Sequence, residues 1–227
     1  MDKTVPAGAA LLLDFIYRTE TSKDAPACYE VIYGNRQAAL TRPITAMTLA
    51  EIQEAQKTWA TKAWAGRFGS TKASSATGAP QFMRATLASL IAELKLSTSQ
   101  KLDANLQDRL AYHLLKRRGY DQFMAGKISR TEFGKRLAQE WASFPVLADT
   151  QGAHRKVARG QSYYVGDSLN KALVAPSAVE AVLDRVKAAG NAVPTVAAAP
   201  QPIVLEPAND NAPGFWARLF AAFRRAA

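Results

Sequence analysis

The spacing of apolar residues predicts an amphipathic helix near the start of the chain. Between residues 11 and 21 they recur at helical spacing, at Leu12, Leu13, Phe15, Ile16 and Tyr17. Thr19, Thr21 and Ser22 fit a helix poorly, so we predict that the helix ends near Arg18 and that a loop follows. Glu20 therefore stands where the apolar pattern stops, at the edge of a core.

A carboxyl group at the edge of a core is partly removed from water. Desolvation raises the pKa of a carboxyl group. A glutamate that keeps its proton near neutral pH can act as a general acid, which makes Glu20 a candidate catalytic residue. This stretch alone leaves open the alternative that Glu20 is an ordinary exposed glutamate at a helix end.

A small β-hairpin is predicted after a polar loop over residues 21–27. Residues 28–33 are rich in aromatic and β-branched side chains, which favour a strand, and Gly34-Asn35 is typical of a turn. A second short strand over residues 38–40 would complete the hairpin.

The chain from residue 48 to 189 reads as helices separated by two long loops. Thr48 and Glu51 have the spacing of a capping box, Pro80 suits a first helical turn, and Gly119 is typical of a helix end. We expect Thr131 to cap a helix. The predicted helices cover 48–65, 80–94, 102–118, 120–125, 131–142 and 177–189, and the loops cover 66–79 and 151–170. We therefore predict a mainly α, α+β domain over residues 1–190.

The composition changes after residue 190. Residues 191–213 are rich in Ala, Pro and Val, which predicts a disordered or semi-extended linker. Residues 214–227 predict a separate amphipathic helix. One face would carry Phe215, Trp216, Leu219, Phe220 and Phe223, and the other Arg218, Arg224 and Arg225.

Arginines opposite aromatic and leucine side chains are typical of helices that lie in a lipid headgroup layer. We therefore expect this segment to bind an anionic membrane or lipopolysaccharide. The alternative is that the helix docks on the domain as extra core.

The composition narrows the choice of partners and sites. The 227 residues include 29 Lys and Arg against 19 Asp and Glu, a net charge of +10 that attracts polyanions. Cys28 is the one cysteine, which excludes an internal disulfide and a cysteine-rich metal site. We expect His113 to be structural and half-buried and His154 to lie on the surface, so we expect no metal and no cofactor. The N-terminus reads as lacking a signal peptide, and no apolar run approaches the roughly 20 residues of a membrane span, so we expect a chain made soluble in the cytoplasm.

Five stretches together resemble the lysozyme superfamily, and more closely the phage lambda type of endolysin, a lytic transglycosylase. They are residues 14–21 (DFIYRTET), 29–34 (YEVIYG), 75–83 (SATGAPQFM), 141–145 (WASFP) and, more weakly, 160–164 (GQSYY). The resemblance spans residues 11–173. It implies a lysozyme-like fold with a cleft and a small hairpin. It also implies an enzyme that cleaves the β-1,4 bond between N-acetylmuramic acid and N-acetylglucosamine in peptidoglycan and so lyses the host cell.

The resemblance assigns roles to several residues of this sequence. Glu20 matches the general acid and Gln81 a residue that lines the cleft, while Pro80 departs from the family pattern. The loop edge of the groove would be formed by Ser75, Thr77 and Gly78. Candidates to stack on or hydrogen bond to sugars are Tyr33, Tyr163 and Tyr164, and packing in the core is an equal alternative for each. We expect Trp141 to belong to the core.

A second carboxylate would decide the product of the reaction. Hydrolytic glycosidases use two carboxyl groups that flank the bond, and Asp24 and Glu30 are the nearby candidates. Each is also interpretable as a solvated charge of a loop or strand. The lambda type lacks a second carboxylate, and there the muramic 6-hydroxyl attacks to give a 1,6-anhydro product. The sequence leaves both outcomes open.

The leading interpretation is thus a phage-type endolysin that works as a monomer. It would be made in the host cytoplasm and act on the periplasmic wall after release. One alternative is a non-catalytic protein on a lysozyme-like fold that binds glycan or builds a virion. The other is a basic nucleic-acid-binding protein, suggested by residues 116–118, but the basic residues are scattered and no recognition-helix pattern is evident. We therefore expect no nucleic-acid partner.

Overall fold

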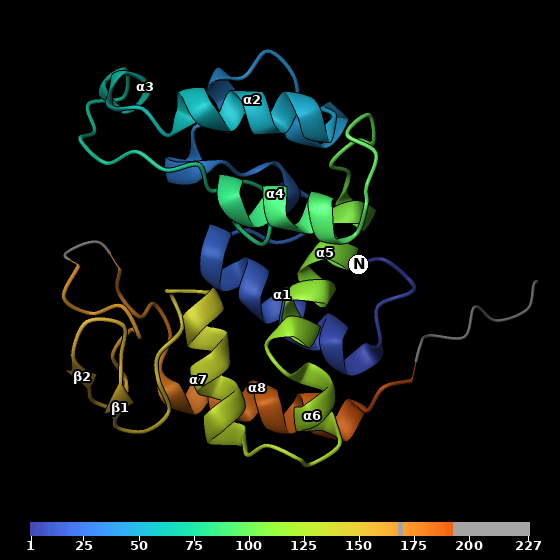
Figure 1. Cartoon of the computed structure of the whole chain (residues 1–227), viewed down its shortest axis with the longest axis vertical. Helices are drawn as coiled ribbons and strands as arrows, with labels where there is room; N and C mark the ends of the chain where they lie inside the picture. Colours follow the sequence, from blue (N-terminus) through green and yellow to red (C-terminus); the bar gives the residue numbers. More distant parts are fainter. Residues whose placement is uncertain (168–169, 193–227) are drawn as a thin grey trace, which may run out of the picture. The chain divides into compact units, whose positions relative to one another are not determined.

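Eight α-helices and one two-stranded sheet form the part of the chain that this computed structural model describes, residues 1–167 and 170–192 (Figure 1). The prediction of a mainly α, α+β domain is confirmed at this level. The helices are α1 Ala7–Thr21, α2 Leu49–Trp59, α3 Lys62–Gly66, α4 Arg84–Glu93, α5 Ala104–Arg117, α6 Tyr120–Met124, α7 Arg130–Glu140 and α8 Pro176–Ala189. The antiparallel strands are β1 Thr150–Gln151 and β2 Lys156–Val157. The predicted linker beyond residue 192 and the predicted C-terminal helix lie outside the described residues.

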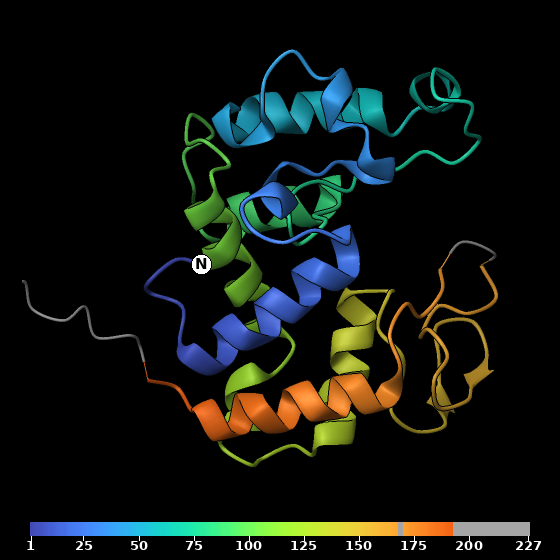
Figure 2. The ribbon, with the colours of Figure 1, turned by 180° about the vertical axis from the view of Figure 1, so that it is seen from behind.

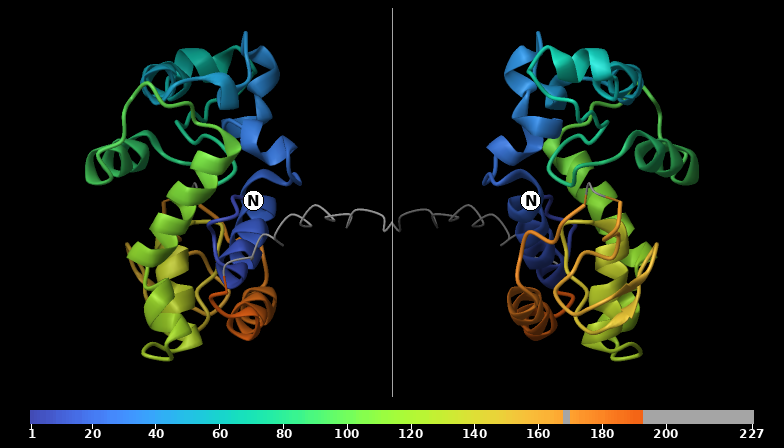
Figure 3. Two further views of the ribbon diagram at one scale, coloured as in Figure 1. Left: turned by 90° about the vertical axis from the view of Figure 1, so that its right-hand side faces the viewer. Right: turned by 90° about the vertical axis from the view of Figure 1, so that its left-hand side faces the viewer.

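The helices of the described part form two groups that α1 and α5 connect. Helices α2, α3 and α4 lie in the upper group of Figure 1, and α6, α7 and α8 lie in the lower group. Helix α1 packs against α8 and α5, as the reverse view also shows (Figure 2). Side views show α5 running from one group to the other (Figure 3). Within the described residues, no helix is both long enough and apolar enough to cross a membrane.

Helix α1 is held in the core along the apolar face that its sequence predicts. Its residues with no exposed surface include Ala9, Leu12, Leu13 and Ile16. The helix ends at Ser22, which has φ +55° and donates its backbone N–H to the Arg18 carbonyl oxygen.

Helix α1 continues past its predicted end, so the prediction that it stops near residue 18 is wrong. The hydroxyls of Thr19 and Thr21 donate to the carbonyl oxygens of Phe15 and Tyr17 at 2.8 and 2.7 Å. These bonds four residues back give each hydroxyl a partner inside the helix. Glu20 consequently lies in the last turn of α1 and not in a loop.

The hairpin predicted over residues 28–40 is also wrong. The segment forms three 3₁₀ turns, η1 Ala27–Glu30, η2 Tyr33–Asn35 and η3 Gln37–Ala39. The extended residue between the first two, Ile32, pairs with Thr77 in an isolated antiparallel bridge. Ile32 therefore pairs with a residue distant in the sequence and not with a neighbouring strand of a hairpin.

The helix predicted over residues 48–65 is two helices. The capping box is confirmed, since Thr48 Oγ1 accepts from the Glu51 backbone N–H while Glu51 Oε2 accepts from the Thr48 N–H. Helix α2 ends at Trp59, and Thr61 caps α3 by accepting from the Trp64 N–H at 3.1 Å. A second N-cap threonine thus restarts the helix in a new direction.

Two further helix starts differ from the predictions. Helix α4 begins at Arg84 and not at Pro80, because residues 77–82 form a tight turn in which the Phe82 N–H donates to the Thr77 carbonyl oxygen at 2.8 Å. The cap of α7 is Ser129, whose hydroxyl accepts from the Glu132 N–H at 3.1 Å, and not the predicted Thr131. Helices α5, α6 and α8 begin and end within two residues of their predicted bounds.

The turn at residues 77–82 is anchored by a buried glutamine of α2. Gln56 has no exposed surface, and its Nε2 donates to the carbonyl oxygens of Ser75 at 2.8 Å and Phe82 at 3.0 Å. It also donates to Thr77 Oγ1 at 3.2 Å. One amide group therefore joins both ends of the turn to α2.

A second buried glutamine, Gln107 of α5, holds the middle of the same turn. Its Oε1 accepts from the Ala79 N–H at 2.9 Å, and its Nε2 donates to the carbonyl oxygens of Tyr29 at 3.1 Å and Leu102 at 3.0 Å. Gly78 has φ +78°, and a Cβ atom there would lie 2.4 Å from Gln107 Oε1. The turn therefore needs glycine at this position.

We expect Gln107→Leu to lower the free energy of unfolding by about 2–5 kcal/mol, because three buried backbone groups would lose their partner. Urea denaturation measures this loss. Gln100→Leu, at an exposed position, is the matched control and should change stability by no more than about 0.5 kcal/mol. Equal stability of the two variants would contradict the anchoring role of Gln107.

Candidate active site

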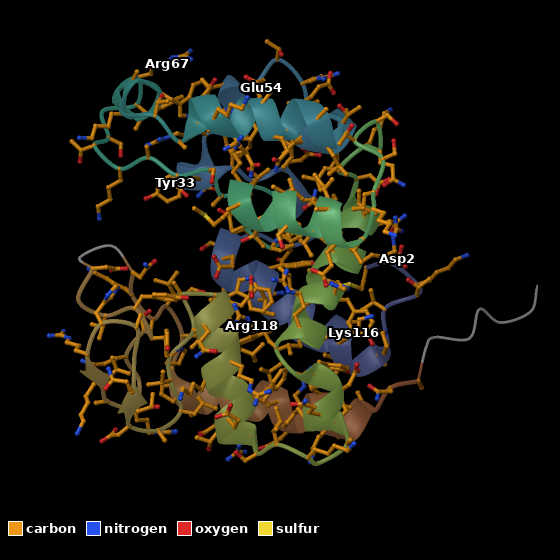
Figure 4. The ribbon with its side chains drawn as sticks, viewed as in Figure 1. Asp2, Tyr33, Glu54, Arg67, Lys116 and Arg118 are labelled. Carbon is orange, nitrogen blue, oxygen red and sulfur yellow. The ribbon has the colours of Figure 1, made fainter. Side chains whose placement is uncertain are left out.

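Glu20, at the end of α1, lines a cleft with a volume of about 760 Å³. One wall comes from η2, the segment before α4 and the first turn of α4, with Tyr33, Lys72, Ser74, Ala76, Gln81, Met83 and Thr86. The facing wall and floor come from the ends of α5 and α7 and from the segments that follow α7, with Arg118, Gln139, Glu140, Trp141, Ala142, Ser143, Tyr164, Asn170, Lys171 and Leu173. Figure 4 shows Tyr33 in the upper group of elements and Arg118 in the lower group.

Two apolar side chains of the cleft are open to water. Met83 and Leu173 are 48% and 64% exposed. A concave surface that combines exposed apolar side chains with a few polar groups is typical of a ligand-binding site.

Glu20 has the electrostatic environment of a general acid. Burial raises the pKa of its carboxyl group to about 7, against the opposing effect of the Ser143 hydroxyl, which donates a hydrogen bond to Oε1. A carboxylate in the last turn of a helix also faces the negative end of the helix dipole, so its position does not stabilise the helix. The proton that Glu20 holds near neutral pH is therefore available for transfer in the cleft.

The structure does not bring the two predicted second carboxylates into the cleft. Glu30 accepts hydrogen bonds from the backbone N–H of Thr45 at 3.3 Å and from its hydroxyl. Asp24 is largely exposed and lies 3.1 Å from Arg18 Nε. Neither residue is among those that line the cleft.

A carboxylate that sequence reasoning missed, Glu140, does line the cleft. Its Oε2 accepts from Arg118 Nε at 2.6 Å, and its side chain is 12% exposed. The two residues come from the ends of α7 and α5. No signal in the sequence paired Arg118 with Glu140, because residues 116–118 suggested only a basic patch for nucleic acid.

The predicted sugar-binding residues divide into two sets. Tyr33, Gln81 and Tyr164 line the cleft. Tyr163 does not: its ring packs edge-to-face on Tyr164 at 5.2 Å and against the core. Trp141 belongs to the core, as expected, and donates its indole N–H to the Pro80 carbonyl oxygen at 3.1 Å, while it also borders the cleft.

Two of the lining residues, Gln81 and Tyr164, already form hydrogen bonds within the protein. Gln81 Nε2 donates to the carbonyl oxygens of Gly78 at 2.7 Å and Val31 at 3.3 Å. The Tyr164 hydroxyl donates to the Gln139 carbonyl oxygen at 2.7 Å. Gln81 Oε1 is therefore the atom of its amide that can accept from a ligand.

The loop edge predicted from Ser75, Thr77 and Gly78 is wrong, because none of the three is among the residues that line the cleft. The Ser75 hydroxyl accepts from the Arg84 N–H at 3.0 Å, and Thr77 has no exposed surface. The cleft is lined instead by the alternate residues Lys72, Ser74 and Ala76. In an extended segment successive side chains point to opposite faces. The sequence did not determine whether the odd-numbered or the even-numbered residues would face the cleft.

Sequence reasoning also missed Ser143, the hydrogen-bond partner of Glu20. The serine lies in the otherwise apolar run 141–147 and is 7% exposed. A hydroxyl in a buried run needs a hydrogen-bond partner, which is a signal that was available. That signal does not identify the partner, because Glu20 is far away in the sequence.

The other groups that could carry chemistry are less suited to it. His113 is half-buried with Nε2 2.8 Å from Glu93 Oε1, and His154 is exposed, as predicted for both. Burial raises the pKa of Cys28 to about 11, so its thiol is not ionised near neutral pH. Within residues 1–167 and 170–192, no three His, Cys, Asp or Glu side chains are grouped so that they could hold a metal ion.

A second cavity, of about 530 Å³, is lined mainly by apolar residues of α1 and of the segment 23–29. Its phenols belong to Tyr17 and Tyr29, and burial together with the neighbouring Asp108 carboxylate raises the pKa of both well above the usual range. These groups keep their protons throughout the neutral range. The cleft at Glu20 is therefore the better candidate for catalysis.

We expect the pKa of Glu20 to appear in the pH dependence of stability. The folded protein binds this proton up to about pH 7 and the unfolded chain only to about 4.5, so the wild type should lose stability as the pH rises between these values. Glu20→Gln does not titrate and should gain on the order of 3 kcal/mol relative to wild type over this window, and no more above it.

Urea denaturation at pH 4, 5, 6, 7 and 8 measures this difference. Glu54→Gln, at an exposed position, is the control. It keeps Glu20, so its stability should fall with pH as that of the wild type does, and the difference between the two should stay nearly constant. A stability difference between wild type and Glu20→Gln that stays constant across the series would contradict the raised pKa.

No protein-family model matches the chain, and neither a curated protein nor a solved structure matches it.

Proposed function

We propose that the chain is a phage-type endolysin that cleaves the β-1,4 bond between N-acetylmuramic acid and N-acetylglucosamine, with Glu20 as the general acid. The observation that carries this proposal is a carboxyl group whose pKa is raised to about 7 in a cleft of about 760 Å³. The resemblance of five sequence stretches to the lambda type of endolysin supports the choice of substrate and a lysozyme-like fold.

The first step needs a protonated carboxyl group in the cleft. Glu20 transfers its proton to the glycosidic oxygen, the bond to the muramic C1 breaks, and the sugar ring develops oxocarbenium character. Because Glu20 holds its proton by desolvation, the transfer leaves a carboxylate that is poorly solvated and can take a proton back. Ser143, which donates to Glu20 Oε1, positions the carboxyl group for both transfers.

The carboxylates of the cleft favour an intramolecular second step. Among the described residues that line it, Glu20 and Glu140 are the two carboxylates, and Glu140 is paired with Arg118 at 2.6 Å. Asp24 and Glu30 lie outside the lining. We therefore favour attack of the muramic 6-hydroxyl on C1, with the Glu20 carboxylate as the base that accepts the hydroxyl proton. The product then carries a 1,6-anhydro ring.

The cellular setting follows from the same proposal. A monomer made in the host cytoplasm would meet its substrate in the periplasm only after release through the inner membrane. The predicted C-terminal helix, residues 214–227, would then bind an anionic leaflet or lipopolysaccharide. This part of the proposal rests on the sequence alone.

We expect Glu20→Gln to lower the rate of peptidoglycan cleavage by about 100- to 10,000-fold, because the amide keeps the shape of the side chain but cannot transfer a proton. Glu30→Gln and Asp24→Asn are matched controls outside the cleft and should each stay within a few-fold of wild type. Turbidity loss of chloroform-treated Gram-negative cells gives the rates, and mass spectrometry of the products identifies the ring ends. Activity of Glu20→Gln within a few-fold of wild type would refute the assignment.

The products also separate the two second steps. The intramolecular route predicts that all products carry 1,6-anhydro ends and that the Glu140→Gln variant stays active. Reducing ends together with an inactive but folded Glu140→Gln variant would instead make Glu140 the second carboxylate of a hydrolase.

We expect deletion of residues 213–227 to leave cleavage of purified peptidoglycan unchanged and to weaken binding to anionic vesicles. Each arginine near an anionic surface contributes about 1 kcal/mol to membrane binding, and the deleted segment carries three on its polar face. Vesicle co-sedimentation and killing of intact cells measure the loss. If the truncated chain binds vesicles as well as the full chain, or unfolds at a lower temperature, the helix is not a membrane anchor.

A further inference from the structure

Five side chains beside the cleft form a stack in which rings and guanidinium groups alternate. Arg36 Cζ lies 5.9 Å from the centre of the Tyr33 ring and 4.9 Å from that of Phe68. Arg67 Cζ lies 5.9 Å from the Phe68 ring and 4.7 Å from the Trp64 ring, and these two rings pack edge-to-face at 5.4 Å. We call Tyr33, Arg36, Trp64, Arg67 and Phe68 the basic ledge.

The ledge is partly open to water, with Trp64 buried and Tyr33 and Arg36 half-buried, and its charges are not neutralised locally. Phe68 is 40% exposed and Arg67 is exposed. The sequence contains no Asp or Glu from residue 55 to residue 92 or from residue 31 to residue 50. Arg36 and Arg67 form no ion pair with any described residue, whereas the neighbouring Arg42 is paired with Glu51.

The ledge is continuous with the cleft. Tyr33 lines the cleft and also stacks on Arg36, and Lys72, a few residues beyond Phe68, lines the same wall. Figure 4 places Tyr33 and Arg67 on the same side of the described part of the chain. A polymer that occupies the cleft and leaves it past Tyr33 would therefore pass over the ledge.

Stacking prepares the two arginines for anions of a particular kind. A ring against the face of a guanidinium group fixes its plane and leaves N–H groups at the edge, where they match both oxygens of a carboxylate. A glycan strand with free carboxylates on its peptide side groups offers such anions at intervals, beside the sugar in the cleft.

We propose that the basic ledge binds carboxylates of the peptidoglycan strand next to the bond in the cleft, and so selects glycans that carry free acidic side groups over neutral ones. This inference rests on the proposed function of the cleft. The continuity of the ledge with the cleft favours a glycan over duplex DNA or a membrane, since neither of those would have to enter the cleft.

The test is co-sedimentation of the full chain, in a Glu20→Gln background that prevents digestion, with purified sacculi. Arg36→Gln/Arg67→Gln should weaken binding at least 5-fold, and the difference should disappear on sacculi whose carboxylates have been amidated. The double change to Lys keeps both charges but loses the two-pronged geometry, so it should bind at an intermediate level. Melting temperatures confirm that each variant is folded.

Arg155→Gln/Arg185→Gln is the matched control, because both arginines are exposed, neither belongs to the ledge, and the pair removes the same net charge. Equal weakening by the two double variants would overturn the proposal in favour of a general charge effect. The proposal would also be overturned if Arg36→Gln/Arg67→Gln lost binding to duplex DNA or to anionic vesicles but kept its binding to sacculi. A different outcome would refute the proposed function: the wild type binds sacculi through the ledge but does not cleave them.

Discussion

The removal of one carboxyl group from water at the end of α1 determines what the cleft can do. Glu20 would be an ordinary carboxylate in solvent, and it holds its proton to about pH 7 because the end of α1 and the segment after α7 enclose it. That enclosure depends on α1 being fixed along its length by α5 and α8. The apolar face of α1 therefore also sets the environment of Glu20, since a tilt of the helix would expose more of its carboxyl group to water and lower its pKa.

The facing wall depends on a different kind of interaction. The segment before α4 has little regular structure, and two buried side-chain amides, of Gln56 and Gln107, supply the hydrogen bonds that a sheet would otherwise give. Each amide joins residues distant in the sequence, so the wall is held from α2 and α5 at once. Gln81 and Tyr33, which line the cleft, gain a fixed position from this arrangement, as ligand-binding groups require.

The sequence predicted local features better than pairings. The apolar face of α1, the capping box at Thr48 and the end of α5 at Gly119 follow from spacing and residue type over a few positions. The hairpin over residues 28–40 failed because β-forming side chains do not specify a partner, and the actual partner of Ile32 is Thr77. Glu20 was identifiable as the edge of an apolar pattern, whereas Ser143 and Glu140 were not, because only the folded chain brings them to the cleft.

The close approach of Gly78 to Gln107 restricts how this cleft can change over time. A side chain at position 78 would overlap the amide that holds the turn, so the two positions can be replaced only together. Positions 72 and 74 have no such limit, because their side chains are at least partly exposed and border the cleft. Sequence changes at such cleft-lining positions should therefore alter which ligands the wall accepts. The residues between them keep the backbone of the wall in place.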